Sequence, residues 1–169
     1  MEGIEDIINK QKEFFKTHKT KDVNYRIEKL KSLKAEIKNR ENDICKALEK
    51  DLGKSSTESY MSEIGMVLED LTYAIKHTKK WSKKEYHLSP LAQFPSSSYR
   101  IAEPYGIALI ISPWNYPFLL TIQPLVGAIA AGNCVVVKPS EYSVHTSNIM
   151  KEIVEAVFEP KYVSVILGE

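Results

Sequence analysis

GIALIISPWNYPFLLTIQPLVGAIAAGNCVVVKPSE, residues 106–141, is the stretch of the sequence that decides the fold. The apolar run over residues 106–112 is continuous, which is typical of a strand covered on both faces, and residues 134–139 repeat that pattern. Between the two runs, Pro117 marks the start of a helix and Gly132 marks its end. A strand, a helix and a second strand joined by short connections predict a right-handed crossover in a parallel sheet.

Apolar spacing extends this pattern in both directions along the chain. Downstream, residues 143–158 are amphipathic at helical spacing, and residues 162–168 form a third apolar run. Upstream, helical apolar stripes occupy residues 4–15, 23–48 and 55–81, and we expect the second stripe to form one long helical region. We predict an α/β fold in which N-terminal helices are followed by a partial Rossmann-like parallel sheet.

The composition is that of a globular protein, with 43% hydrophobic and 27% charged residues among 169 and a formal net charge of +1. This charge balance gives no global field that would attract nucleic acid, so nucleic acid is not an expected partner. The two cysteines are far apart in the sequence and do not make a disulfide framework. Because no apolar stretch approaches the ~20 residues of a membrane span and the N-terminus lacks a signal-peptide core, we expect a cytoplasmic protein.

Polar side chains follow the first two predicted strands, and in an open parallel sheet ligands bind beyond the carboxyl ends of the strands. SPWN follows the first strand, and KPSE, residues 138–141, follows the second. Lys138 and Glu141 could there hydrogen-bond the vicinal hydroxyls of a ribose. The alternative is a plain helix start, with Glu141 favoured by the helix dipole and Lys138 solvated. The spacing leaves both interpretations open.

The sequence lacks the usual motifs of phosphate-binding loops and metal sites. No G-x-G-x-x-G follows the first strand, and GAIAAG at residues 127–132 lacks the Lys-Ser/Thr of a phosphate-binding loop, so we interpret it as a packing motif. Cys45 and Cys134 have the surroundings of small core residues. No metal site is expected, because metal-ligand spacing is absent among the four histidines, His18, His77, His87 and His145.

Beyond these patterns, residues 103–141 closely resemble the start of the coenzyme domain in the aldehyde dehydrogenase superfamily. PWNYP, PL-x-GAIAAGN and KPSE occur in the order and spacing of that family. ALEKDLGKSSTESYMSEIG, residues 47–65, resembles the helical region of its class 3, fatty-aldehyde-type branch. The resemblance implies an incomplete aldehyde dehydrogenase fold: an N-terminal helical region (1–90), a linker with a short strand (91–105) and the first part of an NAD(P)-binding domain (106–169).

The resemblance also implies roles for individual residues. Asn115 matches the catalytic asparagine whose side-chain amide helps to form the oxyanion hole. Lys138 and Glu141 match the pair that contacts the adenine-side ribose of the cofactor. The same resemblance places four further residues along the cofactor channel: Ser112, Pro113, Trp114 and Pro139.

The activity implied by the resemblance is oxidation of an aldehyde to a carboxylic acid with NAD or NADP, through a cysteine nucleophile and a glutamate base. In the family both groups lie well downstream of Lys138, so we expect this chain to be an N-terminal fragment that is inactive alone and homodimeric when complete. Membrane attachment stays open, because in this branch it depends on a C-terminal tail. The alternatives are a non-catalytic truncated remnant that acts as an association module, and a related acyl-transfer enzyme or semialdehyde reductase, which PWNYP and KPSE disfavour.

Overall fold

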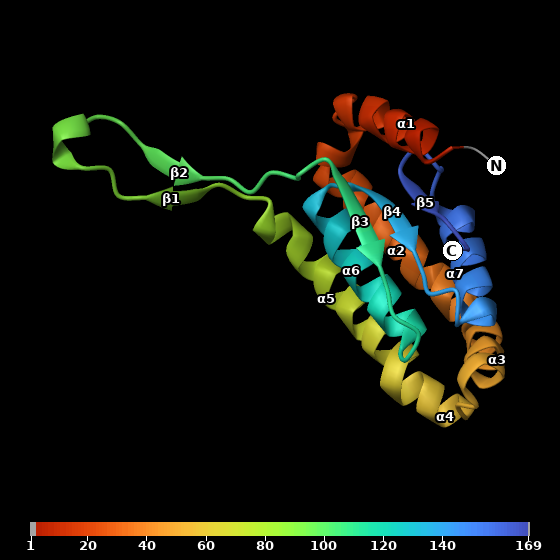
Figure 1. Ribbon diagram of the computed structural model, residues 1–169. Coiled ribbons are helices and arrows are strands. Elements are labelled where there is room, and N and C mark those ends of the chain that lie inside the picture. The colour runs from red at the N-terminus through yellow and green to blue at the C-terminus, as the bar shows by residue number, and fades with distance from the viewer. Residues whose placement is uncertain (1–2, 169) are drawn as a thin grey trace.

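The computed structural model describes residues 3–168, with a layer of helices packed against a small parallel sheet (Figure 1). The chain begins with α1 (Ile4–Lys16), a 3-10 turn (Lys19–Lys21), α2 (Val23–Asn39) and α3 (Glu41–Leu52). No helix within residues 3–168 is long and apolar enough to cross a membrane.

The expectation of one long helical region over residues 23–48 is wrong, because α2 and α3 are separate helices that meet at Arg40. The backbone of Arg40 leaves the helical region, with φ −105° and ψ 17°. The apolar stripe nevertheless continues across the break, since Ile37 before it and Ile44 after it are both fully buried. The apolar spacing therefore gave no sign of the corner.

The third helical region forms as predicted over most of its length, but it contains a π-helical turn. α4 (Ser56–Ser59) continues through the π turn Tyr60–Ile64 into α5 (Gly65–Trp81). A Cβ at residue 65 would lie 2.9 Å from the Tyr60 carbonyl oxygen, so glycine allows the wide turn to close. π turns of this kind occur frequently at functional sites.

The predicted parallel sheet is present in the order β3-β4-β5, formed by β3 (Ile107–Ile111), β4 (Cys134–Lys138) and β5 (Val163–Val165). The connections between these strands are α6 (Pro117–Ala131) and α7 (Val144–Val157). β4 is the central strand, and its first four residues are buried. The mixed α/β architecture with N-terminal helices and a partial sheet is the predicted fold class.

One face of β3 is exposed, which corrects the expectation that this strand is covered on both faces. Leu109 and Ile111 point to the same side of the sheet and are 63% and 72% exposed. Together with Ile4 and Ile8 of α1 they line an apolar hollow of about 350 Å³. Helix α6 packs against the other face, where Ile110 is buried. Within the described residues, α1 covers only part of the exposed face.

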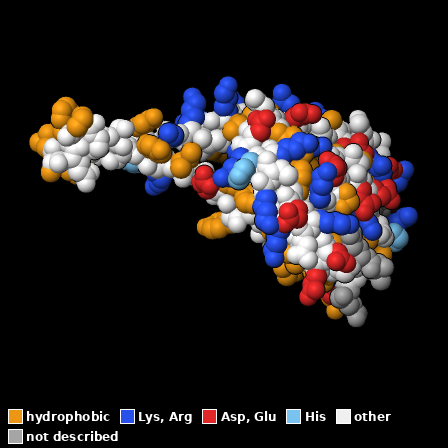
Figure 2. All heavy atoms as spheres, turned by 90° about the horizontal axis from the view of Figure 1, so that it is seen from above, with side chains coloured by type: hydrophobic (Ala, Val, Ile, Leu, Met, Phe, Trp, Pro, Cys, Tyr) orange, Lys and Arg blue, Asp and Glu red, His pale blue; other side chains and the backbone are white. Residues whose placement is uncertain are grey.

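A β-hairpin arm projects away from the body of the molecule (Figure 1). Its strands are β1 (Glu85–His87) and β2 (Ser98–Arg100), which pair antiparallel. Figure 2 shows hydrophobic side chains gathered at the far end of this arm, where Leu88, Leu91 and Phe94 are among the exposed large apolar residues. β2 lies where a short strand is predicted, whereas β1 falls at the end of the segment 1–90, which is predicted to be helical.

Candidate functional site

The strand register brings the SPWN and KPSE segments to the same edge of the sheet. Ile111 at the end of β3 is paired with Lys138 at the end of β4. The backbone N–H of Ser112 donates to the Lys138 carbonyl oxygen at 3.2 Å, so the ladder continues one residue past the strand. The predicted site residues therefore lie on two neighbouring loops at the carboxyl edge, where parallel sheets bind their ligands.

In the KPSE loop, Lys138 and Glu141 form an ion pair that is open to solvent. The Lys138 ammonium donates to Glu141 Oε2 at 3.1 Å and to the Pro139 carbonyl oxygen at 3.4 Å. The two side chains are 26% and 39% exposed. A hydrogen bond from its own backbone N–H, assisted by Lys138, lowers the pKa of Glu141, so the carboxylate is ionised at neutral pH.

A cavity of about 200 Å³ lies beside this pair. Its walls combine Glu141 and Pro139 with apolar side chains from the start of α7 and from the end of the chain, Val144 and Leu167. A carboxylate that accepts and an ammonium that donates suit a pair of adjacent hydroxyls, and the apolar walls suit a flat ring. The residues present therefore fit the ribose-containing part of a nicotinamide cofactor. Within residues 3–168 no His, Cys, Asp and Glu cluster could hold a metal ion.

In the SPWN loop, the predicted residues differ in what they can reach. Pro113, Trp114 and Asn115 are exposed at the edge of the sheet. Ser112 is instead buried, and its hydroxyl is hydrogen-bonded to Thr121 Oγ1 at 2.6 Å, so its side chain anchors the loop on α6. Pro139 is also buried. Pro139 lines the cavity of about 200 Å³, whereas Ser112 does not. For both residues a place along a cofactor channel remains a prediction.

Two buried residues that the sequence analysis did not identify, Glu63 and Lys54, contact the SPWN loop and the start of α6. Glu63, in the π turn, is fully buried, and its Oε2 accepts the backbone N–H groups of Phe118 and Leu119 at 2.9 and 3.1 Å. Its Oε1 lies 2.5 Å from the ammonium of Lys54, whose side chain is 9% exposed. Glu63 shares a helical face with the buried Val67, a pattern that could have revealed a charge on the apolar side.

The Glu63 carboxylate takes the place of the missing cap of α6. Tyr116 at the N-cap position makes no side-chain capping bond, and Pro117 at the first turn has no N–H to offer. A carboxylate is favoured at a helix N-terminus for the same reasons as a phosphate. Glu63 therefore supplies, from within the chain, the negative group that a helix N-terminus favours.

Helix α7 is capped in the same way from the helical layer. Asp51, at the end of α3, accepts the backbone N–H groups of His145 and Thr146 at 3.1 and 2.7 Å. Ser143, just before α7, donates its hydroxyl to the Trp114 carbonyl oxygen at 3.2 Å. The N-terminal helices thus fix the starts of both helices that leave the carboxyl edge.

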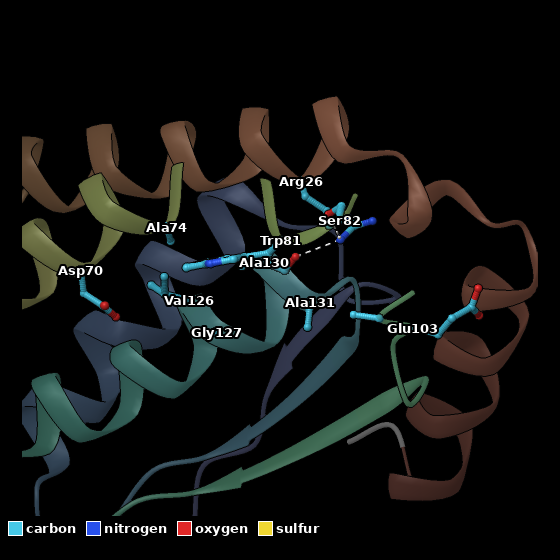
Figure 3. Close-up of a pocket in the computed structure, with 11 residues that line it drawn as sticks. Arg26, Asp70, Ala74, Trp81, Ser82, Glu103, Val126, Gly127, Ala130 and Ala131 are labelled. Atoms are coloured by element: carbon cyan, nitrogen blue, oxygen red, sulfur yellow. Dashed lines mark hydrogen bonds between the residues drawn. The ribbon is translucent and has the colours of Figure 1, made fainter. Parts of the chain in front are cut away.

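A separate cavity of about 230 Å³ lies between α5 and α6 and contains none of the predicted site residues (Figure 3). Its buried Arg26 donates to the Ala130 carbonyl oxygen at 2.9 Å and to the Lys21 carbonyl oxygen at 2.7 Å. The acidic residues Asp70 and Glu103 lie at opposite ends of it in Figure 3. The guanidinium is engaged in holding the end of α6, so this cavity shows no set of convergent groups for catalysis.

Both cysteines lie in the core, as predicted. Cys134 is fully buried at the amino end of β4, opposite the edge that carries SPWN and KPSE. Burial raises the pKa of its thiol to about 11. Burial also raises the pKa of Cys45 in α3. Because the thiolate is the nucleophilic form, neither thiol is suited to attack a substrate at the carboxyl edge near neutral pH.

Comparison with known proteins shows which family the chain belongs to. The model of the Aldehyde dehydrogenase family matches residues 1–169. A relative, 4,4'-diaponeurosporen-aldehyde dehydrogenase of Staphylococcus aureus, is 45% identical over 168 residues, which are 99% of this chain and 37% of that protein. Aldehyde dehydrogenase family 3 member F1 of Arabidopsis thaliana is 37% identical over 167 residues, 99% of this chain and 34% of that protein.

Solved structures agree with these relatives. The substrate-bound state of Staphylococcus aureus AldH matches with a TM-score of 0.97 and 44% identity, over 100% of this chain and 37% of that one. A betaine aldehyde dehydrogenase of the same species in complex with NAD⁺ matches with a TM-score of 0.85 and 27% identity, over 98% of this chain and 33% of that one. The chain therefore spans 33–37% of the length of these proteins, and it belongs to the aldehyde dehydrogenase family.

Proposed function

We propose that this chain, as a member of the aldehyde dehydrogenase family, forms the N-terminal part of an enzyme that oxidises an aldehyde to a carboxylic acid with NAD⁺ or NADP⁺. The observation that carries the proposal is the meeting of two loops at one edge of the sheet. One loop presents the exposed Asn115, and the other presents Lys138 and Glu141 beside a cavity. The NAD⁺-bound betaine aldehyde dehydrogenase of related fold supports a nicotinamide cofactor.

The chain's own residues would then bind the cofactor and stabilise charge. Lys138 donates and the ionised Glu141 accepts, so the pair can hold two adjacent ribose hydroxyls. The amide of Asn115 is an uncharged donor that can point at an oxygen where negative charge develops during the reaction. The bound cofactor supplies the hydride acceptor.

We propose that the nucleophilic cysteine and the glutamate base come from further residues of a longer protein. The buried Cys134, whose pKa is raised to about 11, is unsuited to the role. The apolar face of β3, where Leu109 and Ile111 are exposed, is a surface that a further layer of a larger domain would cover. Both observations favour a chain that contributes binding and positioning groups and receives its nucleophile from elsewhere.

We further propose that the complete enzyme is a homodimer that uses the hairpin arm. The arm exposes Leu91 and Phe94 at its tip and leaves the outer edges of β1 and β2 unpaired within the described residues. Exposed apolar groups and open strand edges are features of association surfaces. A related enzyme of Canis lupus familiaris, 38% identical over 172 residues, is named a dimeric, NADP-preferring aldehyde dehydrogenase.

The proposal is tested by producing a longer protein that carries residues 1–169 and measuring aldehyde-dependent reduction of NAD⁺ and NADP⁺. We expect the longer protein to form the reduced cofactor and the carboxylic acid in equal amounts. The 169-residue chain by itself should form neither product. In the longer protein, Cys45→Ser and Cys134→Ser should leave the rate of aldehyde oxidation unchanged. Reduced cofactor made by the 169-residue chain and abolished by either serine variant would overturn the assignment of the nucleophile. A longer protein that is folded, binds no cofactor and oxidises no aldehyde would favour the association module.

A further inference from the structure

Lys54 and Glu63 form a buried ion pair that the proposed reaction leaves without a role. The side chain of Glu63 has no exposed surface and that of Lys54 is 9% exposed. Replacing a buried ion pair by apolar residues of similar size is often neutral or stabilising, because removing both charges from water is costly. The cap on α6 accounts for a carboxylate at residue 63, but it does not by itself account for a cation that also contacts the Asn115 carbonyl oxygen.

The remaining hydrogen-bonding capacity of the pair is directed at one segment, residues 115–119. Glu63 accepts two consecutive backbone N–H groups at the start of α6. The Lys54 ammonium lies 3.4 Å from the carbonyl oxygen of Asn115 and 4.1 Å from the centre of the Tyr116 ring. The pair thus holds the backbone on both sides of Pro117.

The neighbours of Asn115 in the loop have other partners, and the Asn115 carbonyl oxygen is contacted by Lys54. The Trp114 carbonyl oxygen is held by Ser143, and the Ser112 hydroxyl is held by Thr121. Lys54 contacts the next carbonyl oxygen along the chain, that of Asn115 itself. Because the direction of a side chain follows from its backbone, the Lys54 contact helps to decide where the Asn115 amide points.

We propose that Glu63 and Lys54 are positioning residues for Asn115, acting from behind the loop to hold its amide at the place where negative charge develops. The inference rests on the proposed function, because it takes Asn115 to be the donor for that charge. It adds that the donor is set by two charged residues from the helical layer, on the far side of the loop from the substrate. A displacement of about 1 Å at such a group can lower the rate by about 100-fold.

The first arm of the test measures whether the pair holds the loop, and it needs no activity. In the 169-residue chain, amide hydrogen exchange is compared between wild type, Glu63→Gln and Asp51→Asn. We expect Glu63→Gln to speed exchange at Phe118 and Leu119, whose N–H groups donate to Glu63. Asp51→Asn is the matched control, since it weakens a similar cap on α7 and should speed exchange at His145 and Thr146 only. Unchanged exchange at Phe118 and Leu119 would overturn the inference.

The second arm measures whether this positioning serves the reaction, in the longer enzyme. We expect Glu63→Gln to lower kcat by roughly 10- to 100-fold with little change in the KM of the cofactor. Asp51→Asn should lower the melting temperature and leave kcat close to wild type. The double variant Lys54→Met with Glu63→Gln removes both charges, so it should be more stable than Lys54→Met alone while its kcat stays low.

Each result decides between a positioning role and a purely structural one. Recovery of kcat together with stability in the double variant would overturn the inference, as would equal losses of kcat in Glu63→Gln and Asp51→Asn. Failure of the proposed function gives a different pattern. In that case the wild-type longer protein itself oxidises no aldehyde, and the catalytic part of the inference falls with it, whatever the exchange measurement shows.

Discussion

A lysine–glutamate ion pair accompanies each of the two loops at the carboxyl edge of the sheet, but the pairs differ in burial and in the groups that they contact. Lys54 and Glu63, behind the SPWN loop, are almost completely buried and bind the loop's backbone. Lys138 and Glu141, in the KPSE loop, are partly exposed, and Lys138 donates to Glu141 and to the Pro139 carbonyl oxygen of the same loop.

The difference in burial indicates different roles: the buried pair fixes the backbone of its loop, and the partly exposed pair is accessible to a ligand. A buried charge must satisfy its partners permanently, because leaving it unpaired in a low-dielectric interior is costly. An exposed pair is weak, since water screens the attraction and can replace either partner. Lys138 and Glu141 can therefore exchange their mutual contact for a ligand, whereas the Lys54–Glu63 pair is suited to a fixed structural arrangement.

The largest effect that separates the two pairs is expected from Lys54→Met. This change leaves the Glu63 carboxylate buried without its cation, so we expect the free energy of unfolding to fall by about 3–5 kcal/mol. Thermal or urea unfolding of the 169-residue chain measures it. A loss below about 1 kcal/mol would show that the buried pair behaves like a surface pair, and the contrast would not hold.

The next largest effect is expected from Asn115→Ala in the SPWN loop. In the longer enzyme, Asn115→Ala should lower kcat by about 10²–10³, equivalent to about 2.7–4 kcal/mol, because a donor to developing negative charge is lost. The side chain is exposed, so stability should change little. Steady-state kinetics and a melting curve of the same preparation test both points. Near-normal turnover with a lowered melting temperature would mean that Asn115 only stabilises the turn.

A smaller effect is expected from Glu141→Gln in the exposed pair. Exchanging a charged hydrogen bond for a neutral one should weaken NAD⁺ binding by roughly tenfold. It should weaken NADP⁺ binding less, because the carboxylate repels a 2′-phosphate. Titrating both cofactors against wild type and variant gives the ratio. An unchanged ratio would remove Glu141 from the cofactor site.

The same carboxylate predicts a pH dependence with a defined sign. The pKa of Glu141 is lowered in the folded protein, so the contribution of this carboxylate to stability is fully present above its ordinary pKa of 4.5. That contribution is lost as the pH falls through the lowered pKa. If NAD⁺ binding depends on the same charge, NAD⁺ affinity should stay constant from neutral pH until the pH approaches the lowered pKa of Glu141. Glu141→Gln should abolish the acid limb.

The smallest effect is expected from Lys138→Met. An exposed ion pair contributes about 0–1 kcal/mol, so the unfolding free energy should hardly change while cofactor affinity falls. Measuring unfolding beside Lys54→Met under the same conditions makes the comparison direct. Equal losses of stability in the two methionine variants would mean that the two ion pairs do not differ in their contribution to folding.

Much of the edge of the sheet could be predicted from the sequence, because its signals are local. Pro117 near the start of α6 and the apolar runs of β3 and β4 fixed the elements that carry Asn115, Lys138 and Glu141. Parallel pairing then requires the two loops to share an edge. The roles of these residues came from the family resemblance, and their chemistry stays a prediction for the kinetic and binding experiments.

The sequence by itself thus determined the alternation of strands and helices after residue 105, the parallel sheet and the family, since periodicity, turn residues and motif spacing all lie within short stretches. Only the tertiary structure decided that Glu63 caps a helix 55 residues away, that α2 and α3 meet at a corner, and that one face of β3 is exposed. The physical reason is that most charged residues on helices face solvent, so the sequence alone predicts a solvated side chain at such a position. Which groups surround the side chain is decided by tertiary packing. Long-range partners are properties of the packed chain, and no local pattern in the sequence shows that Glu63 binds the start of α6.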